Sequence, residues 1–215
     1  MTEEPDDYEC PPDKTCIKSM LHRAFGLFWE QKGLLISAHL ILVAILLGGD
    51  YLLRGVGGNV LLGPFVLGMY KINLAIVRNK NTDISDILAG FEYFLPAFIA
   101  NILIHLATFI GTWLLIVPGL IIFVTYAPTY LFILERNMGF WDAMEASRAM
   151  VWGNKKLWVS LGLALVAINL SGLLCFVVGL IVTISYTQLL ITLAYETEIN
   201  REKPLVQLEH AEMTG

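Results

Sequence analysis

The sequence predicts an all-α membrane protein with six transmembrane helices, arranged as three hairpins that each follow a short cytoplasmic amphipathic helix. Three observations support this fold class. Of the 215 residues, 56% are hydrophobic and only 15% are charged, whereas about a quarter of the residues in soluble domains are charged. Several apolar stretches approach the roughly 20 helical residues that cross a bilayer. Three amphipathic segments recur along the chain, each followed by a pair of such stretches.

The longest apolar stretch covers residues 101–135 and holds no charged residue before Glu135. It is too long for one ordinary span, so the chain must turn within it. Proline removes a helical N–H and glycine adds backbone freedom, so we expect two antiparallel helices that meet at Pro118-Gly119. These helices are the predicted third and fourth spans, residues 93–117 and 119–134.

The other spans follow from the same hydropathy pattern. They are residues 33–47, extending at most to Leu53, then 59–77, 157–177 and 179–195. The resulting membrane domain covers residues 15–195. It is flanked by an acidic N-terminal tail, residues 1–14, which we expect to be disordered, and by a polar C-terminal tail, residues 196–215.

Each amphipathic segment carries an apolar stripe at the spacing of an α-helix. Thr15 and Thr82 are placed to cap the first two segments, and Gly153 is placed to end the third in a left-handed conformation. The stripes are Ile17, Met20, Leu21, Ala24 and Phe28 in the first segment, Ile84, Ile87, Leu88 and Phe91 in the second, and Phe140, Ala143, Met144, Ser147 and Val151 in the third.

The basic residues orient the chain, because cytoplasmic loops of membrane proteins carry an excess of lysine and arginine. Twelve bases fall on the side shared by the tails and the amphipathic segments, and only Arg54 falls in a loop on the other side. Six spans place both termini on the same side. We therefore expect both termini and all three amphipathic helices in the cytoplasm.

Many of these bases lie beside the amphipathic segments and form what we call the basic collar: Lys18, Arg23, Lys32, Arg78, Lys80, Arg148, Lys155 and Lys156. Each base near an anionic membrane surface contributes about 1 kcal/mol of attraction. We therefore expect the collar to contact anionic membrane lipids or a partner protein. The net charge of −5 gives no indication of a nucleic-acid partner, and we expect none.

Five short motifs are spread over the membrane domain. They are Gly63-Pro64 with Gly68, DISDILAGF, LLIVPGLII, AMEASRAMVWGNKKLW and YTQLLITLAYE. Through them the chain resembles a prokaryotic six-span integral membrane family known as domain of unknown function 975, and it is similar to the membrane domain found with some glycerophosphodiester phosphodiesterases. The resemblance implies a six-span protein of the prokaryotic cytoplasmic membrane and brings no activity. Ser185 departs from the Pro-Tyr of that family, which affects a kink in the sixth span rather than the fold.

Polar residues within spans often mark function, because hydrocarbon offers them no partner. Four of them in the third span are spaced so that they share one helix face: Asn101, His105, Thr108 and Thr112. One interpretation is a hydrated path or headgroup site, to which Asn169 of the fifth span would belong, and it would make the protein a small transporter or channel. The interpretation that we favour is that these side chains hydrogen-bond to neighbouring helices.

Lys71 lies about two turns before the cytoplasmic end of the second span. It would either neutralise the phosphate of an anionic lipid between helices or, as we favour, snorkel toward the interface without a ligand. We expect the isolated polar residues His39, Asn73 and Gln188 to join helices. A seam of small residues in the fifth span predicts close packing against another span or another copy of the chain; it consists of Ser160, Ala164, Ala167 and Ser171.

The sequence contains no catalytic signature. No acidic residue lies deep in a span, and the chain has no paired carboxylates, HExxH metal motif, GxSxG elbow or phosphate-binding GxxxxGKS loop. The spacing of Cys10, Cys16 and His22 is not that of a zinc site. We therefore expect a non-enzymatic protein that needs no cofactor and no metal.

Overall fold

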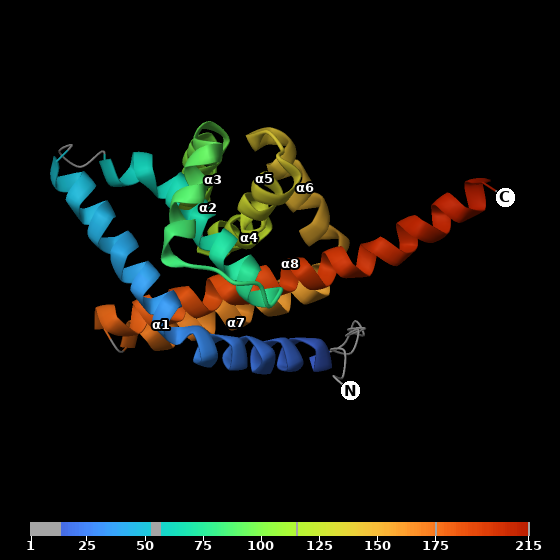
Figure 1. Ribbon diagram of the computed structural model, residues 1–215, viewed down its shortest axis with the longest axis horizontal. Helices are drawn as coiled ribbons and strands as arrows, with labels where there is room; N and C mark the ends of the chain where they lie inside the picture. The colour runs from blue at the N-terminus through green and yellow to red at the C-terminus, as the bar shows by residue number, and fades with distance from the viewer. Residues whose placement is uncertain (1–13, 53–56, 115, 175, 215) are drawn as a thin grey trace.

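The computed structural model describes residues 14–52, 57–114, 116–174 and 176–214, and no strand occurs in these ranges. The prediction of a disordered tail falls on residues 1–13, which lie outside the described residues. The helices are α1 (Lys14–Leu52), α2 (Gly57–Val77), the 3₁₀ helix η1 (Ile84–Tyr93), α3 (Phe94–Leu114), α4 (Ile116–Tyr126), α5 (Thr129–Arg136), α6 (Phe140–Gly153), α7 (Lys155–Leu174) and α8 (Phe176–Thr214). Figure 1 labels the eight α-helices.

Five helical runs in the described part of the chain are long and apolar enough to cross a membrane. They are Ile17–Gly49, Ile84–Trp113, Val117–Arg136, Lys155–Leu174 and Gly179–Arg201, and α2 adds the shorter apolar stretch Leu61–Val77. Large apolar side chains cover the outside of these helices, as with Leu106 and Phe109 on α3 and Leu163 and Leu170 on α7. Such a surface is unfavourable in water and suits lipid. The protein is therefore an all-helical, multi-pass membrane protein.

The helix α8 is the centre of the packing. Every residue from Leu189 to Tyr195 is buried, and a helix that is apolar and covered on all sides lies inside a bundle. The helices α1, α2 and α7 pack against it, and Figure 1 shows α7 and α8 side by side with the first half of α1 along them. The polar residues that closely follow this segment, Glu196 and Glu198, therefore lie within reach of other helices.

The first amphipathic segment is the beginning of α1 and leads into the first span through a kink at Gln31, whose φ and ψ are −107° and 16°. Its predicted stripe faces inward, because Met20, Ala24 and Phe28 are buried. The Tyr186 hydroxyl of α8 donates a hydrogen bond to the Leu21 carbonyl at 2.9 Å. The helix begins at Lys14, so Thr15 lies inside its first turn and is not the predicted cap.

The second amphipathic segment is the 3₁₀ helix η1, not the predicted α-helix. Residues of a 3₁₀ helix share a face at a spacing of three, so Ile87 and Gly90 are buried while the predicted stripe members Leu88 and Phe91 are exposed. The tighter winding accompanies very close packing on α2. A Cβ on Gly90 would overlap the Pro64 carbonyl oxygen of α2. The helix η1 runs directly into α3 and belongs to the same apolar run.

Pro118-Gly119 lies within helix α4 and not in a turn as predicted. Helix α3 ends at Leu114 and α4 begins at Ile116, so Pro118 sits in the first turn of α4, where a missing N–H costs nothing. Gly119 allows α4 to pack closely against α3, because a Cβ on it would overlap the Thr112 hydroxyl of α3. The proline and glycine therefore start and pack a helix and do not form the turn.

A break at Pro128 separates α4 from α5 within the fourth predicted span. The last carbonyls of a helix have no partner in their own helix. The Ser147 hydroxyl of α6 supplies one, since it donates to the Thr125 carbonyl at 2.7 Å. The break is thereby tied to α6, whose predicted inward face, including Ala143 and Val151, is buried.

The end of α6 differs from the prediction in its backbone. Gly153 is the last residue of α6 and does not have a left-handed conformation. Asn154 follows it with φ −125° and ψ 62°, and its N–H donates to the Met150 carbonyl at 3.4 Å. The next helix, α7, begins directly after Asn154. Because the chain passes at once from one helix into the other, no left-handed glycine is needed to end α6.

Candidate functional site

An arginine between two glutamates joins three helices at the polar end of the bundle. Arg78 Nε and Nη2 donate to Glu196 Oε2 of α8 at 3.1 and 2.8 Å, and Nη1 pairs with Glu135 of α5. Burial acts to lower the pKa of the Arg78 guanidinium, but the hydrogen bonds and charges of the two carboxylates outweigh burial and raise that pKa. The guanidinium therefore stays charged and holds α2, α5 and α8 together.

The chain reaches this position through the end of α2. Asn79 has a left-handed backbone, with φ 52°. The Asn79 N–H donates to the Ile76 carbonyl and the Lys80 N–H to the Ala75 carbonyl, which is the Schellman pattern of helix ends. This tight cap holds Arg78, the residue just before Asn79, at the helix end beside α5 and α8.

A second polar contact brings α7 to the same end of α8. The Asn154 amide, between α6 and α7, donates to Glu198 Oε1 at 2.8 Å. Glu198 and Ile199 are buried, so the packed part of α8 continues past residue 195, where the sequence predicted a polar tail. The C-terminal ends of α2 and α5 and the N-terminal end of α7 consequently meet around one segment of α8.

The basic collar separates into two groups in the structure. Arg78 is the exception, because two carboxylates hold it and it is only partly exposed. The other seven members are exposed: Lys18, Arg23, Lys32, Lys80, Arg148, Lys155 and Lys156. Arg148 pairs with Glu145 on its own helix at 3.4 Å. The sequence could not distinguish Arg78 from the other collar bases, because its two partners, Glu135 and Glu196, are far from it in the sequence.

Two collar lysines lie over exposed tryptophans. Lys32 Nζ is 3.8 Å from the ring centroid of Trp29, and Lys155 Nζ is 4.7 Å from that of Trp152. Both distances are within the range of cation–π attraction. Tryptophan and lysine together are typical of the membrane–water interface.

Lys71 has a partner that neither interpretation of the sequence named. Its Nζ lies 3.3 Å from Asp86 Oδ1 of η1. The Asp86 carboxylate also accepts hydrogen bonds from the Asp83 N–H at 3.1 Å and the Thr82 hydroxyl at 2.9 Å. Lys71 thus fixes the start of η1 against α2. The spacing of the sequence gave no sign of the pair, because it depends on the 3₁₀ winding of η1.

The polar stripe of the third span lies on α3 and changes environment along its length. Asn101 is buried, and its Oδ1 accepts a hydrogen bond from the Tyr130 hydroxyl of α5 at 3.0 Å. His105 is exposed, with Nδ1 2.9 Å from the Asn101 carbonyl, and the Thr112 hydroxyl donates to the Thr108 carbonyl at 2.8 Å. The Thr108 hydroxyl is buried without a partner in the described structure. Three of the four side chains therefore have a hydrogen bond: Asn101 to another helix, and His105 and Thr112 within α3.

Other predicted polar residues lie in the core or bond to their own helix. Asn169 Nδ2 donates to the Leu165 carbonyl at 2.8 Å. His39 Nδ1 is 3.0 Å from the Leu35 carbonyl, while its Nε2 and both amide atoms of the buried Asn73 have no hydrogen-bond partner among the described residues. The described residues contain no group of three or more histidine, cysteine, aspartate or glutamate side chains that could hold a metal ion.

The small residues predicted to form a packing seam on α7 are only partly covered. Ser160 and Ala164 are half-buried, and Ala167 and Ser171 are exposed. The close approaches of α7 within the chain involve two glycines instead. A Cβ on Gly162 would lie 3.0 Å from Val124 Cγ2 of α4, and a Cβ on Gly172 would overlap the Thr183 side chain of α8. Contact of the exposed half of the seam with another copy of the chain stays a prediction.

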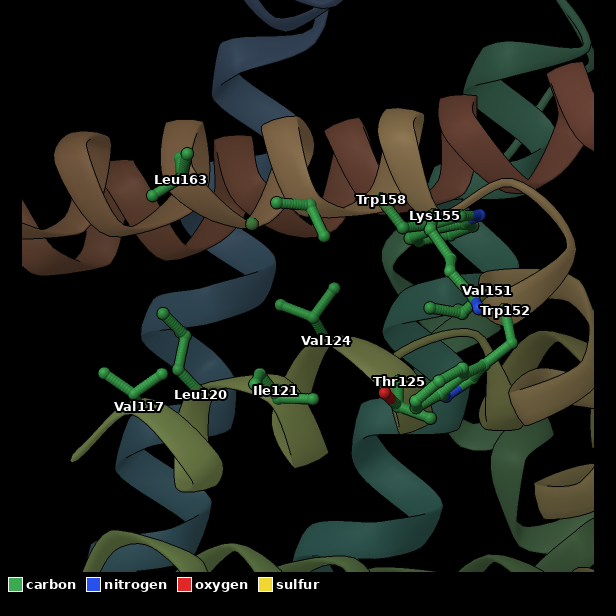
Figure 2. Close-up of a pocket in the computed structure, with 12 residues that line it drawn as sticks. Val117, Leu120, Ile121, Val124, Thr125, Val151, Trp152, Lys155, Trp158 and Leu163 are labelled. Carbon is green, nitrogen blue, oxygen red and sulfur yellow. The ribbon is translucent and has the colours of Figure 1, made fainter. Parts of the chain in front are cut away.

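An apolar groove of about 350 Å³ lies between α4, α6 and α7 (Figure 2). Its walls come mainly from α4 and α7, and Trp152 and Lys155 lie at one end (Figure 2). No residue of the polar stripe on α3 lines it. Sequence reasoning missed the groove because its lining is shared among three helices and none of their apolar positions is distinctive by itself.

Comparison with known proteins identifies no family and no function for the chain. No protein-family model, curated protein or solved structure matches the chain at a significant level. The resemblance to the six-span prokaryotic family stays a prediction, and the functional argument depends on the geometry of the chain itself.

Proposed function

We propose that the chain is a non-enzymatic, six-span protein of the prokaryotic cytoplasmic membrane, with both termini in the cytoplasm, and that its basic collar binds anionic lipids. The five long apolar runs and the apolar exterior support a multi-pass arrangement. The exposed collar lysines supply the positive charge that anionic lipids attract. The pairing of Lys155 with the exposed Trp152 is the observation that carries the proposal.

The sixth span in this proposal is α2. Its 21 residues correspond to a length of about 32 Å at the usual rise of an α-helix, and a bilayer core is about 30 Å thick. Helices η1 and α3 together would form one span, and α4 and α5 another. Both of these spans would contain a break, at the junction of η1 with α3 and at Pro128.

Exposed aromatic residues support two membrane interfaces. Trp29, Trp141 and Trp152 are exposed near collar residues, while Tyr51 and Trp113 are exposed near the ends of α1 and α3, where the chain turns back. Aromatic residues of this type gather at both surfaces of a bilayer. The first group would mark the cytoplasmic surface and the second group the outer surface.

The test compares the lipids that co-purify with the protein from vesicles of phosphatidylglycerol and phosphatidylcholine in equal amounts. We expect the wild type to enrich phosphatidylglycerol, and the double variant Lys155→Glu with Lys156→Glu to lose most of the enrichment. The matched control is Arg54→Glu, since this base is predicted on the other side. Equal enrichment in the wild type and the double variant, or none in the wild type, contradicts the proposal.

A further inference from the structure

We propose that the groove between α4, α6 and α7 holds one acyl chain of an anionic phospholipid, with the lipid phosphate at Lys155. This inference rests on the proposed function, because it gives the collar a defined lipid site. The occupant is set by two properties of the groove: apolar walls and a basic end. A polar ligand would lose its hydration along such walls without gaining hydrogen bonds.

The walls of the groove are aliphatic and open to the membrane. Leu120 and Ile121 of α4 line the groove together with Val159 and Leu163 of α7. Leu163 is 65% exposed and Ile121 53%, so an acyl chain could enter from the surrounding lipid. At Gly162 the two helices come close together, because a Cβ there would lie 3.0 Å from Val124 Cγ2.

The length of the groove corresponds to one leaflet. Lys155 at one end and Leu163 toward the other lie eight positions apart on α7, which is about 12 Å along a helix. Half of a bilayer core is about 15 Å thick. A chain seated here would therefore have its headgroup at Lys155 and its methyl end near the middle of the membrane.

The basic end of the groove is suited to a phosphate. Lys155 and Lys156 are exposed and open α7, and the first turn of a helix carries partial positive charge that favours anions. Glu198, which accepts a hydrogen bond from the Asn154 amide at 2.8 Å, carries one negative charge against the two positive charges of Lys155 and Lys156. The net charge of these three groups is therefore positive.

The test is native mass spectrometry of the full chain in detergent, titrated with phosphatidylglycerol or phosphatidylcholine of identical acyl chains. We expect one phosphatidylglycerol to bind tightly. Leu163→Trp fills the groove and should weaken this binding about tenfold, whereas Leu170→Trp, on the same helix but outside the groove and 59% exposed in the wild type, should not. Lys155→Ala should weaken binding of phosphatidylglycerol roughly fivefold, as expected for one base near an anionic group, and leave phosphatidylcholine unchanged.

Several outcomes overturn the inference, and they differ from failure of the proposed function. Equal lipid binding by Leu163→Trp and Leu170→Trp overturns the proposed lipid site in the groove. The proposed function survives this result if the wild type still enriches phosphatidylglycerol from vesicles. A dimer that binds no lipid and dissociates in Leu163→Trp assigns the groove to a second copy and also overturns it. A second variant, Ile121→Trp on the opposite wall, guards against misfolding, and both variants should elute as the wild type does in size-exclusion chromatography.

Discussion

The Arg78 guanidinium donates two hydrogen bonds to a single carboxylate oxygen of Glu196, at 3.1 and 2.8 Å, although 118 positions separate the two residues. Glu135 pairs with the same guanidinium. Since Arg78 directly follows α2, Glu135 lies near the end of α5 and Glu196 lies in the middle of α8, one charged group fixes the relative positions of three helices that are far apart in the sequence. The other seven members of the basic collar are exposed.

Replacement of Arg78 by methionine should destabilise the protein strongly. It removes the only base that the structure shows between Glu135 and Glu196 and leaves two carboxylates close together. Loss of one partner costs about 3 kcal/mol in a buried ion pair and less than about 1 kcal/mol in an exposed one, so this partly buried cluster should lose about 2 kcal/mol. The free energy of unfolding, measured by SDS titration in mixed micelles, should fall by this amount.

The control for Arg78 is Arg148→Met. Arg148 forms an exposed pair with Glu145 on the same helix at 3.4 Å, and such pairs contribute at most about 0.5 kcal/mol. The further change Glu196→Gln should recover part of the stability that Arg78→Met loses, because it removes one of the repelling charges. If both arginine variants unfold at the same SDS concentration, the ionic cluster has no special structural role.

Gly90→Ala should disrupt the contact between η1 and α2. A Cβ at this position would overlap the Pro64 carbonyl, and overpacking of this kind costs about 1–3 kcal/mol. Gly26→Ala on α1 is the matched control, since nothing lies within 4 Å of a Cβ there, and alanine is favoured over glycine in a helix by about 1 kcal/mol. Thermal unfolding followed by size-exclusion chromatography should show opposite shifts for the two variants. A lowered midpoint for Gly26→Ala together with an unchanged one for Gly90→Ala would refute the contact.

These contacts indicate what the sequence could and could not predict. The inward face of α6 was predicted correctly, because the spacing of Ala143, Ser147 and Val151 is a local property of the chain. The 3₁₀ winding of η1 was missed, because it accompanies backbone contact between Gly90 and Pro64, which no periodicity reveals. A tertiary contact overrode the apolar stripe that favoured an α-helix.

The candidate sites show the same division. The exposure of Lys155 and Lys156 followed from their position among polar residues at the start of an apolar run. The pairing of Lys71 with Asp86 and the sharing of the groove among three helices depend on how helices are placed relative to one another. Hydropathy and charge patterns carry no information on that placement.

Tyr130→Phe should test whether the polar stripe of α3 joins helices. The variant removes the donor to the buried Asn101 Oδ1, and a hydrogen bond between membrane helices contributes about 0.6 kcal/mol on average. Asn101→Leu should cost a similar amount, and the double variant should cost less than the sum. His105→Ala should change the free energy of unfolding by less than about 0.5 kcal/mol, because His105 is exposed. Proteoliposomes in which His105→Ala alone alters solute flux would favour the transporter interpretation instead.

Cysteine labelling should test the six spans and their direction. In a variant with Cys10, Cys16 and Cys175 changed to serine, Gly48→Cys and Gly153→Cys form a matched pair, because nothing lies within 4 Å of a Cβ at either glycine. A membrane-impermeant maleimide should label Gly48→Cys in intact cells and Gly153→Cys only after the membrane is opened, since Gly48 lies toward the predicted outer end of α1 and Gly153 at the end of α6 beside the collar. Labelling of both from outside would place the collar on the outer face, where the proposed cytoplasmic lipid site could not form. Five spans would place the two termini on opposite sides of the membrane, whereas six spans place both on the same side. A tag at each terminus, tested for protease access in the same cells, distinguishes these two arrangements.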